Sequence, residues 1–187
     1  KQDLPIVESI FVSKKTKLNL ETISKNKNWK EIVIKPTISG AARHTYLLKK
    51  DEIKNFQDKW LSLTNDEDFM VQEFQKNILN SGEIAVVLFG GEYSHSVLKK
   101  AKKGDFRVQD DFGGSVERIN PSLEIIELAE KTVKSLKTTP LYARVDIIFD
   151  NDNNPVISEL ELIEPELWFR FKEESAYKLA AFVKDFL

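Results

Sequence analysis

The sequence predicts an α+β fold whose sheets are antiparallel. Strand patterns and helix patterns alternate along the chain, and most of the strands are expected to pair as hairpins. Gly90-Gly91 lies between two apolar strand patterns, which is a strong hairpin signal. The turn at 151–155, of sequence NDNNP, joins two further strands. Because a hairpin makes its two strands antiparallel, a doubly wound parallel sheet is not expected.

The first part of the chain is predicted to combine short strands with helices. Its expected elements are a weak helix at 18–27, strands at 31–35, 44–50 and 69–74, and a helix that begins at Asp51. This last helix is well supported, because apolar residues recur at helical spacing: Ile53, Phe56, Trp60 and Leu63. We expect a small lobe at 1–69.

The second part, 70–187, is predicted to form a larger lobe. Its expected elements are a hairpin at 83–89 and 93–99, a polar loop at 104–114, a helix at 121–136, a hairpin at 141–163 and a helix at 175–187.

Composition excludes several classes of function. The chain has 187 residues, of which 41% are hydrophobic, and this is enough for a real core. Its formal net charge of −2 comes from acids and bases mixed along the chain, so no nucleic-acid partner is expected. The absence of cysteine excludes disulfides, zinc–thiolate sites and a cysteine nucleophile. No apolar run is long enough for a membrane span, and a cytoplasmic location is expected.

Three carboxylates of the 141–163 hairpin are the strongest chemical signal. Asp146 lies inside an apolar run, where a charge is costly unless it is paired. Glu159 and Glu161 are two apart on the second strand, so their side chains share one face of the sheet, and Asp146 can lie opposite them. Oxygen ligands favour a hard cation, and Mg²⁺ bridging nucleotide phosphates is a common use. The alternative is an ordinary edge hairpin whose acids face solvent.

Two earlier segments have patterns suited to a nucleotide. Lys35 ends an apolar strand before the small-residue loop 37–43, whose backbone N–H groups can approach phosphate oxygens. The alternative is that Gly40 simply marks a turn. The segment MVQEF (70–74) is a strand leading into a loop, which suits an adenine edge, but it is also typical of a core strand. Glu83 is a candidate for the ribose hydroxyls or an ordinary residue at the start of a strand.

Cations cluster between the central hairpin and the polar loop. Lys99 and Lys100 point to opposite faces of their strand, so only one of them can face a cleft. Arg107 stands apart from this lysine run, in a polar segment bordered by glycines, where a guanidinium can reach a phosphoryl group. The alternative is a charged surface loop. Lys99 and Arg107 are the candidate catalytic residues.

The order and spacing of these segments resemble the ATP-grasp superfamily, over nearly the whole chain. The motifs are VIKP (33–36), MVQEF (70–74), GDFR with the trailing GG (104–114), and ARVDII with ISELELIEP (143–165). The chain is similar to the glutathione synthetase-like enzymes and the ribosomal-protein glutamate ligases. GGEYSHSVLKK, GDFRVQ and SELELIEP also resemble the cyclo-ligases of cycloserine synthesis.

This resemblance implies a two-lobed ATP-grasp fold, with the nucleotide held between the lobes, and a role for each candidate. Lys35 would contact the α- or β-phosphate, and the loop 39–45, with Ser39 and Gly40, would close over the γ-phosphate. Gln72, Glu73 and Phe74 would form the adenine hinge, with Glu83 near the ribose. The ligands of Mg²⁺ or Mn²⁺ would be Asp146, Glu159 and Glu161. Arg107 would stabilise the transferred phosphoryl group.

The chain departs from the resembled families in three respects. Glu161 stands where the glutamate ligases and glutathione synthetases usually have asparagine, so the third ligand adds negative charge. The phosphate loop contains one glycine, Gly40, where relatives often have several. The chain begins with Lys1 at a point that follows the usual N-terminal domain, so we interpret it as a piece that lacks this domain and a phosphate-binding lysine.

The function that the resemblance implies is an ATP- and Mg²⁺-dependent ligase, which joins a carboxylate to an amine through an acyl-phosphate. The expected substrates are small molecules of the amino acid or peptide class, and a homodimer is possible. Two rival functions are other phosphoryl transfer on the same fold and a non-catalytic nucleotide-binding module. The residues that choose the carboxylate and the amine have no recognisable pattern here.

Overall fold

The computed structural model describes residues 3–40, 42–102, 108 and 113–186, and Arg107 lies outside them. The chain forms two compact units, Val7–Gln75 and Lys1–Ile6 with Lys76–Leu187. The boundary expected from the sequence, between 69 and 70, falls inside strand β4 (Phe69–Glu73), which pairs along its length with strands of the first unit.

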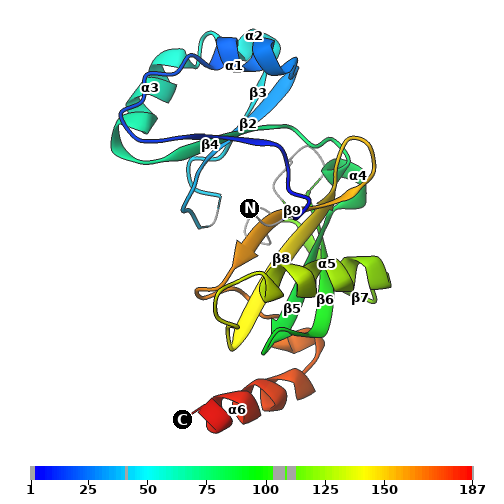
Figure 1. Cartoon of the computed structure of the whole chain (residues 1–187). Helices are drawn as coiled ribbons and strands as arrows, with labels where there is room; N and C mark the ends of the chain where they lie inside the picture. The colour runs from blue at the N-terminus through cyan, green and yellow to red at the C-terminus, as the bar shows by residue number, and fades with distance from the viewer. Residues whose placement is uncertain (1–2, 41, 103–107, 109–112, 187) are drawn as a thin grey trace. The chain divides into compact units, whose positions relative to one another are not determined.

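The first unit contains a four-stranded antiparallel sheet in the order β1-β4-β2-β3. Its elements are β1 (Ser9–Val12), α1 (Leu20–Lys27), β2 (Glu31–Pro36), β3 (Tyr46–Lys49), α2 (Lys50–Ile53), α3 (Gln57–Asp66) and β4. Figure 1 shows the three helices of this unit together with the sheet. Ile32 and Ile34 of β2 lie in register with β4 and point into the helix-covered core, where Trp60 is also fully buried.

Side chains alternate across β2, so Val33 and Lys35 lie on the other face of this sheet. Val33 pairs with Gln72, and Lys35 pairs with Met70. Lys35 and Gln72 therefore share the sheet face that does not belong to the helix-covered core.

The helix expected from Asp51 is interrupted. It is divided into α2 and α3, and at the junction the amide of Gln57 donates to the carbonyl of Lys54, an i→i+3 bond of 3.4 Å that is tighter than an α-helical turn. Three short elements were also not expected: β1, α4 (Ile78–Ser81) and β7 (Ser115–Ile119). Short elements have too few residues to show a period.

The second unit contains a five-stranded antiparallel sheet in the order β7-β6-β5-β8-β9 (Figure 1). Besides α4 and β7 its elements are β5 (Glu83–Phe89), β6 (Glu92–Lys100), α5 (Leu123–Lys134), β8 (Tyr142–Phe149), β9 (Pro155–Glu161), the 3₁₀ turn η2 (Phe169–Phe171) and α6 (Glu174–Phe186). The hairpins predicted around Gly90-Gly91 and around 151–155 are both present.

Each face of this sheet has its own apolar cover. Helix α5 packs Ile125, Ala129 and Val133 on one face, against residues such as Val86 and Val145. The opposite face carries Ala85, Val87, Phe89 and Val97, and it is covered by Trp168 with partly buried residues of η2 and α6. No helix in the described part of the chain is long and apolar enough to span a membrane.

The segment that leads into η2 is tied to β6 by a buried histidine. His95 is 2% exposed; its Nε2 lies 2.8 Å from the carbonyl oxygen of Leu167, and its Nδ1 lies 3.0 Å from the hydroxyl of Ser94. This pattern suits a neutral ring that donates through Nε2 and accepts at Nδ1. Burial lowers the pKa of His95, and the nearby Lys172 and Arg118 act in the same direction, whereas the Leu167 carbonyl and Glu174 oppose them.

We predict that His95 makes the protein less stable in acid. Because its pKa is lowered in the folded state, the unfolded chain binds more protons as the pH falls below about 6.5, the ordinary histidine value, and the free energy of unfolding decreases. Urea unfolding of the wild type and of His95→Gln, between about pH 5 and about pH 8, measures this. The difference in free energy between the two proteins should shrink as the pH falls; a difference independent of pH would contradict the prediction.

Candidate metal centre

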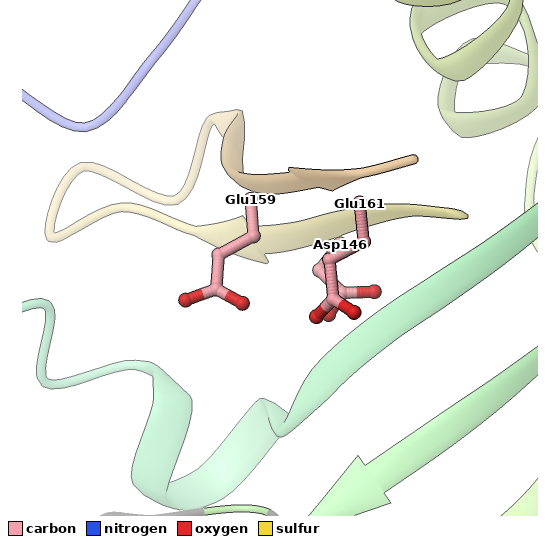
Figure 2. Close-up of side chains that lie close together, drawn as sticks. All are labelled: Asp146, Glu159 and Glu161. Carbon is pink, nitrogen blue, oxygen red and sulfur yellow. The ribbon is translucent and has the colours of Figure 1, made fainter. Parts of the chain in front are cut away.

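The register of the β8–β9 hairpin brings the three predicted carboxylates together. Asp146 lies directly opposite Glu159, and Arg144 lies opposite Glu161. Residues two apart on a strand share a face, so all four side chains project to one side of the hairpin. Figure 2 shows the carboxylates of Asp146, Glu159 and Glu161 on this side.

A β-bulge is part of this arrangement. Asp146 pairs with Glu159 but the next residue, Ile147, pairs with Ile157, so Ser158 is an extra residue in β9. Bulges are common next to active sites, where they redirect a side chain. Here the bulge keeps Ile157 directed into the α5 core while Glu159 and Glu161 project from the other face.

The carboxylates are close enough to share one ligand. One oxygen from each of Asp146, Glu159 and Glu161 lies within 4.8 Å of the others. Asp146 has no exposed surface, whereas Glu159 and Glu161 are half-buried. The sequence-based expectation that Asp146 lies opposite the Glu159/Glu161 pair agrees with this geometry, and the solvent-facing alternative does not hold for Asp146.

Two buried cations neutralise part of this charge. The ammonium of Lys99 donates to one oxygen of Asp146 at 2.8 Å and also pairs with Glu83. The guanidinium of Arg144 donates from Nε to the other oxygen of Asp146 at 2.8 Å, and it pairs with Glu161. Lys99 is 4% exposed, so it is the buried member of the Lys99/Lys100 pair.

Arg144 is the functional candidate that the sequence reasoning missed. The available signal was its spacing, since it lies two residues before Asp146 in the same apolar strand and must therefore share its face. A second charge on one face of a buried strand indicates an ion pair, because an unpaired one is too costly.

The register of the sheet explains how the charged groups of this cluster are accommodated in the interior. Glu83 pairs with Lys99 across β5 and β6, and Ala85, two residues further on the same face, pairs with Asp146. The small side chain of Ala85 leaves space for the Asp146 carboxylate and its two cations.

The electrostatics keep Asp146 ionised. Burial alone would raise its pKa, but the charges and hydrogen bonds of Lys99 and Arg144 outweigh burial and lower it. Burial likewise opposes the charge of Lys99, and the carboxylates of Asp146 and Glu83 overcome this and raise the pKa of Lys99. The outer carboxyl behaves differently: burial raises the pKa of Glu161 to about 7, the charges of Asp146 and Glu159 act in the same direction, and the attraction to Arg144 and Lys99 opposes them.

These residues fit a divalent metal ion. Among the described residues, the carboxylates of Glu83, Asp146, Glu159 and Glu161 gather around the two cations Lys99 and Arg144. Three of these carboxylates supply the oxygen ligands that Mg²⁺ or Mn²⁺ prefers.

The residues predicted to bind adenine and the phosphates, apart from Arg107, lie in the first unit. Lys35 is half-buried on the sheet face that it shares with Gln72. The amide of Gln72 is buried and donates to the hydroxyl of Ser9 at 2.7 Å. At the end of β4, the backbone N–H of Phe74 donates to the carbonyl of Glu31, and the carbonyl of Glu73 accepts from the side chain of Gln75.

The predicted phosphate loop is exposed and internally bonded. The hydroxyl of Ser39 donates to the carbonyl of Arg43 at 3.0 Å, and Arg43 N–H donates to the carbonyl of Gly40. The guanidinium of Arg43 forms two bonds, of 2.7 and 2.6 Å, with the carboxylate of Glu67.

The chain belongs to the family of RimK-like ATP-grasp domains, whose model matches residues 2–167. Among curated proteins, it is 27% identical over 129 residues to the cycloserine biosynthesis protein DcsG of Streptomyces lavendulae. This match covers 63% of the chain and 42% of DcsG. The chain therefore spans less than half the length of this relative.

Solved structures show the same fold. The D-cycloserine synthetase DcsG superposes with a TM-score of 0.84 at 20% identity, over 97% of this chain and 65% of that protein. The D-alanine–D-alanine ligase of Bacillus anthracis, solved with ATP, gives a TM-score of 0.70 at 19% identity, over 97% and 60%. The ATP-grasp ligase PsnB, solved with a variant of its minimal precursor, Mg and ADP, gives a TM-score of 0.68 at 17% identity, over 97% of this chain and 54% of PsnB. The predicted ATP-grasp resemblance and α+β fold class are thus confirmed.

We predict that Asp146 is essential for the stability of the fold. Asp146→Asn leaves the buried Lys99 and Arg144 with less neutralising charge, so the free energy of unfolding should fall by about 3–5 kcal/mol. Urea denaturation followed by circular dichroism measures this. Asp152→Asn, the same change at an exposed position of the same hairpin, is the control and should alter stability by about 0.5 kcal/mol or less. Equal effects of the two variants would disprove the prediction.

Proposed function

We propose that the protein is an ATP- and Mg²⁺-dependent ligase that joins a carboxylate to an amine. One observation carries this proposal: on an ATP-grasp fold, Asp146, Glu159 and Glu161 gather their oxygens within 4.8 Å beside the buried cations Lys99 and Arg144. Such a cluster is suited to a divalent ion and to the oxygens of a polyphosphate, and its chemistry needs no nucleophilic side chain from the protein.

The reaction proceeds in two displacements. A carboxylate oxygen of the first substrate attacks the γ-phosphorus of ATP, the bond from this phosphorus to the β,γ-bridging oxygen breaks, and ADP leaves. The amine nitrogen of the second substrate then attacks the acyl carbon, inorganic phosphate leaves with the electrons of the carbon–oxygen bond, and the nitrogen loses a proton. Positioning and charge neutralisation are what the protein contributes.

The residues of the second unit have distinct tasks in this proposal. Asp146, Glu159 and Glu161 hold the metal ion, which neutralises the phosphate oxygens when it is bound. Lys99 and Arg144 orient Asp146 and add positive charge at the transferred phosphoryl group. Glu83 holds Lys99, through the ion pair that the two make. Arg107 is proposed as a further cation for the phosphoryl group.

The residues of the first unit bind the rest of the nucleotide. Lys35 contacts the α- or β-phosphate, and the loop that contains Ser39 and Gly40 approaches the γ-phosphate. Gln72, Glu73 and Phe74, at the end of β4, bind adenine. Support for this assignment is the shared sheet face of Lys35 and Gln72 and the position of the loop directly after β2.

Amino acids or peptides are the substrate class that the comparisons favour. One structural neighbour is a D-alanine–D-alanine ligase, and another, PsnB, is described with its minimal precursor or precursor peptide.

We expect Mg²⁺-ADP to stabilise the chain and Glu159 to be needed for this. A ligand at about 100 times its Kd adds roughly 2.7 kcal/mol, which is a shift of several degrees in Tm. Glu159→Gln removes a carboxylate charge from the triad but keeps the Lys99–Asp146–Arg144 ion pairs, so the shift, measured against the variant's own Tm without ligand, should be lost. Glu127→Gln, at an exposed position on α5, is the matched control and should keep the shift. GTP in place of the adenine nucleotide should give a smaller shift.

The acyl-phosphate step is tested by trapping the activated carboxylate. With ATP, Mg²⁺ and a panel of amino acids and peptides, hydroxylamine should trap the activated carboxylate as a hydroxamate, in amounts that match the ADP released. ADP and phosphate without hydroxamate would instead indicate phosphoryl transfer to water or a hydroxyl. Nucleotide binding with no ADP release for any substrate would support a non-catalytic module.

A further inference from the structure

The indole ring of Trp168 lies over both buried cations of the candidate metal centre. The ammonium nitrogen of Lys99 is 5.7 Å from the ring centroid, and the guanidinium carbon of Arg144 is 5.1 Å from it. Both distances are within the range of a cation–π interaction, which is strongest for tryptophan and for desolvated cations. Trp168 itself is 4% exposed.

The backbone at Trp168 is held in an uncommon conformation. Its φ and ψ are 46° and 43°, in the left-handed region, which bulky residues rarely adopt because it strains the backbone. The carboxylate of Glu166 accepts the N–H of Trp168 at 2.7 Å and so supports this turn.

Neighbouring residues anchor the same segment to the sheet. The carbonyl of Leu167 accepts from His95 on β6, and the carbonyl of Phe171 accepts from the guanidinium of Arg118 on β7. Lys172 donates to the carbonyl of Ser94 at 2.7 Å. Hydrogen bonds to the sheet therefore fix the strained turn on both sides of Trp168, and this fixes the position of its indole ring.

The ring completes the surroundings of the two cations. Lys99 directs its N–H groups to Asp146 and Glu83, and Arg144 directs its own to Asp146 and Glu161. The ring of Trp168 lies over both cations. A π face attracts a cation while leaving its N–H groups free to bond to the carboxylates, and it excludes water. It therefore strengthens the ion pairs with Asp146 and limits the rotamers of both long side chains.

We propose that Trp168 is a positioning residue of the candidate metal centre: its ring holds the Lys99 ammonium and the Arg144 guanidinium against Asp146. The role in nucleotide binding rests on the proposed function, whereas the effect on the two cations does not. The competing explanation is that Trp168 only fills the core with its neighbours, which include Ala85, Val87, Phe89 and Val97.

Four variants separate the two explanations. Trp168→Leu removes the π face, and Trp168→Phe keeps a smaller one. Glu166→Gln weakens the support of the turn and keeps the ring. Phe169→Leu is the matched control, because it removes an aromatic ring of the same segment, one that stacks on Phe89.

The first measurement is the hydrogen exchange of the Arg144 Nε–H, followed by NMR in the ligand-free chain and assigned with Arg144→Lys. Trp168→Leu should speed this exchange by about tenfold, the size expected when desolvated cation–π contacts are lost. Trp168→Phe should restore most of the protection, Glu166→Gln should give an intermediate rate, and Phe169→Leu should stay near the wild type. Equal exchange in Trp168→Leu and Phe169→Leu, at equal loss of Tm, would overturn the proposal.

The second measurement is the Kd of Mg²⁺-ADP by calorimetry for the same proteins. If the wild type binds, Trp168→Leu should bind about tenfold more weakly than Phe169→Leu, and equal affinities would overturn the role in binding. If the wild type does not bind, the proposed function fails. The exchange rates then still decide whether Trp168 positions the two cations.

Discussion

The complete burial of the Asp146 carboxylate is the constraint on which the rest of the second unit depends. An ionised carboxylate inside a protein is stable only if charges and hydrogen bonds replace water. Lys99 from β6 and Arg144 from β8 supply them, and Ala85 on the strand between leaves the space. The order of the strands therefore places both cations within reach of a single acid.

The same arrangement gathers two further carboxylates at the edge of the cluster. Glu159 and Glu161 lie beside Asp146, and the pKa of Glu161 is raised chiefly by burial, with the charges of Asp146 and Glu159 acting in the same direction and Arg144 opposing them. A stable fold alone would not need carboxylates at this place, because an apolar pair would pack there at lower cost. A bound divalent ion would reduce the repulsion among these carboxylates, and this is the physical basis of the proposed metal site.

The parts of the fold and of the candidate site that could be predicted from the sequence are those that depend on neighbouring residues. The hairpins, the long helix α5 and the carboxylate triad were predictable, because turn residues and side-chain periods act over a few neighbours. The outline of the first unit was predictable as well, apart from strand β1 and the break between α2 and α3. Short elements such as β1 and β7 were missed, since their four or five residues depend on pairing with distant strands.

The sequence by itself determined the chemistry of the site: which carboxylates alternate onto one face, and that an acid inside an apolar run needs a partner. Only the tertiary structure decided the partners, because Lys99 is close to Asp146 through two strand registers and not through any spacing along the chain. It also placed Trp168 over the two cations, through a left-handed turn tied to β6 and β7. Local patterns specify faces, whereas the pairing of distant strands and loops specifies which faces meet.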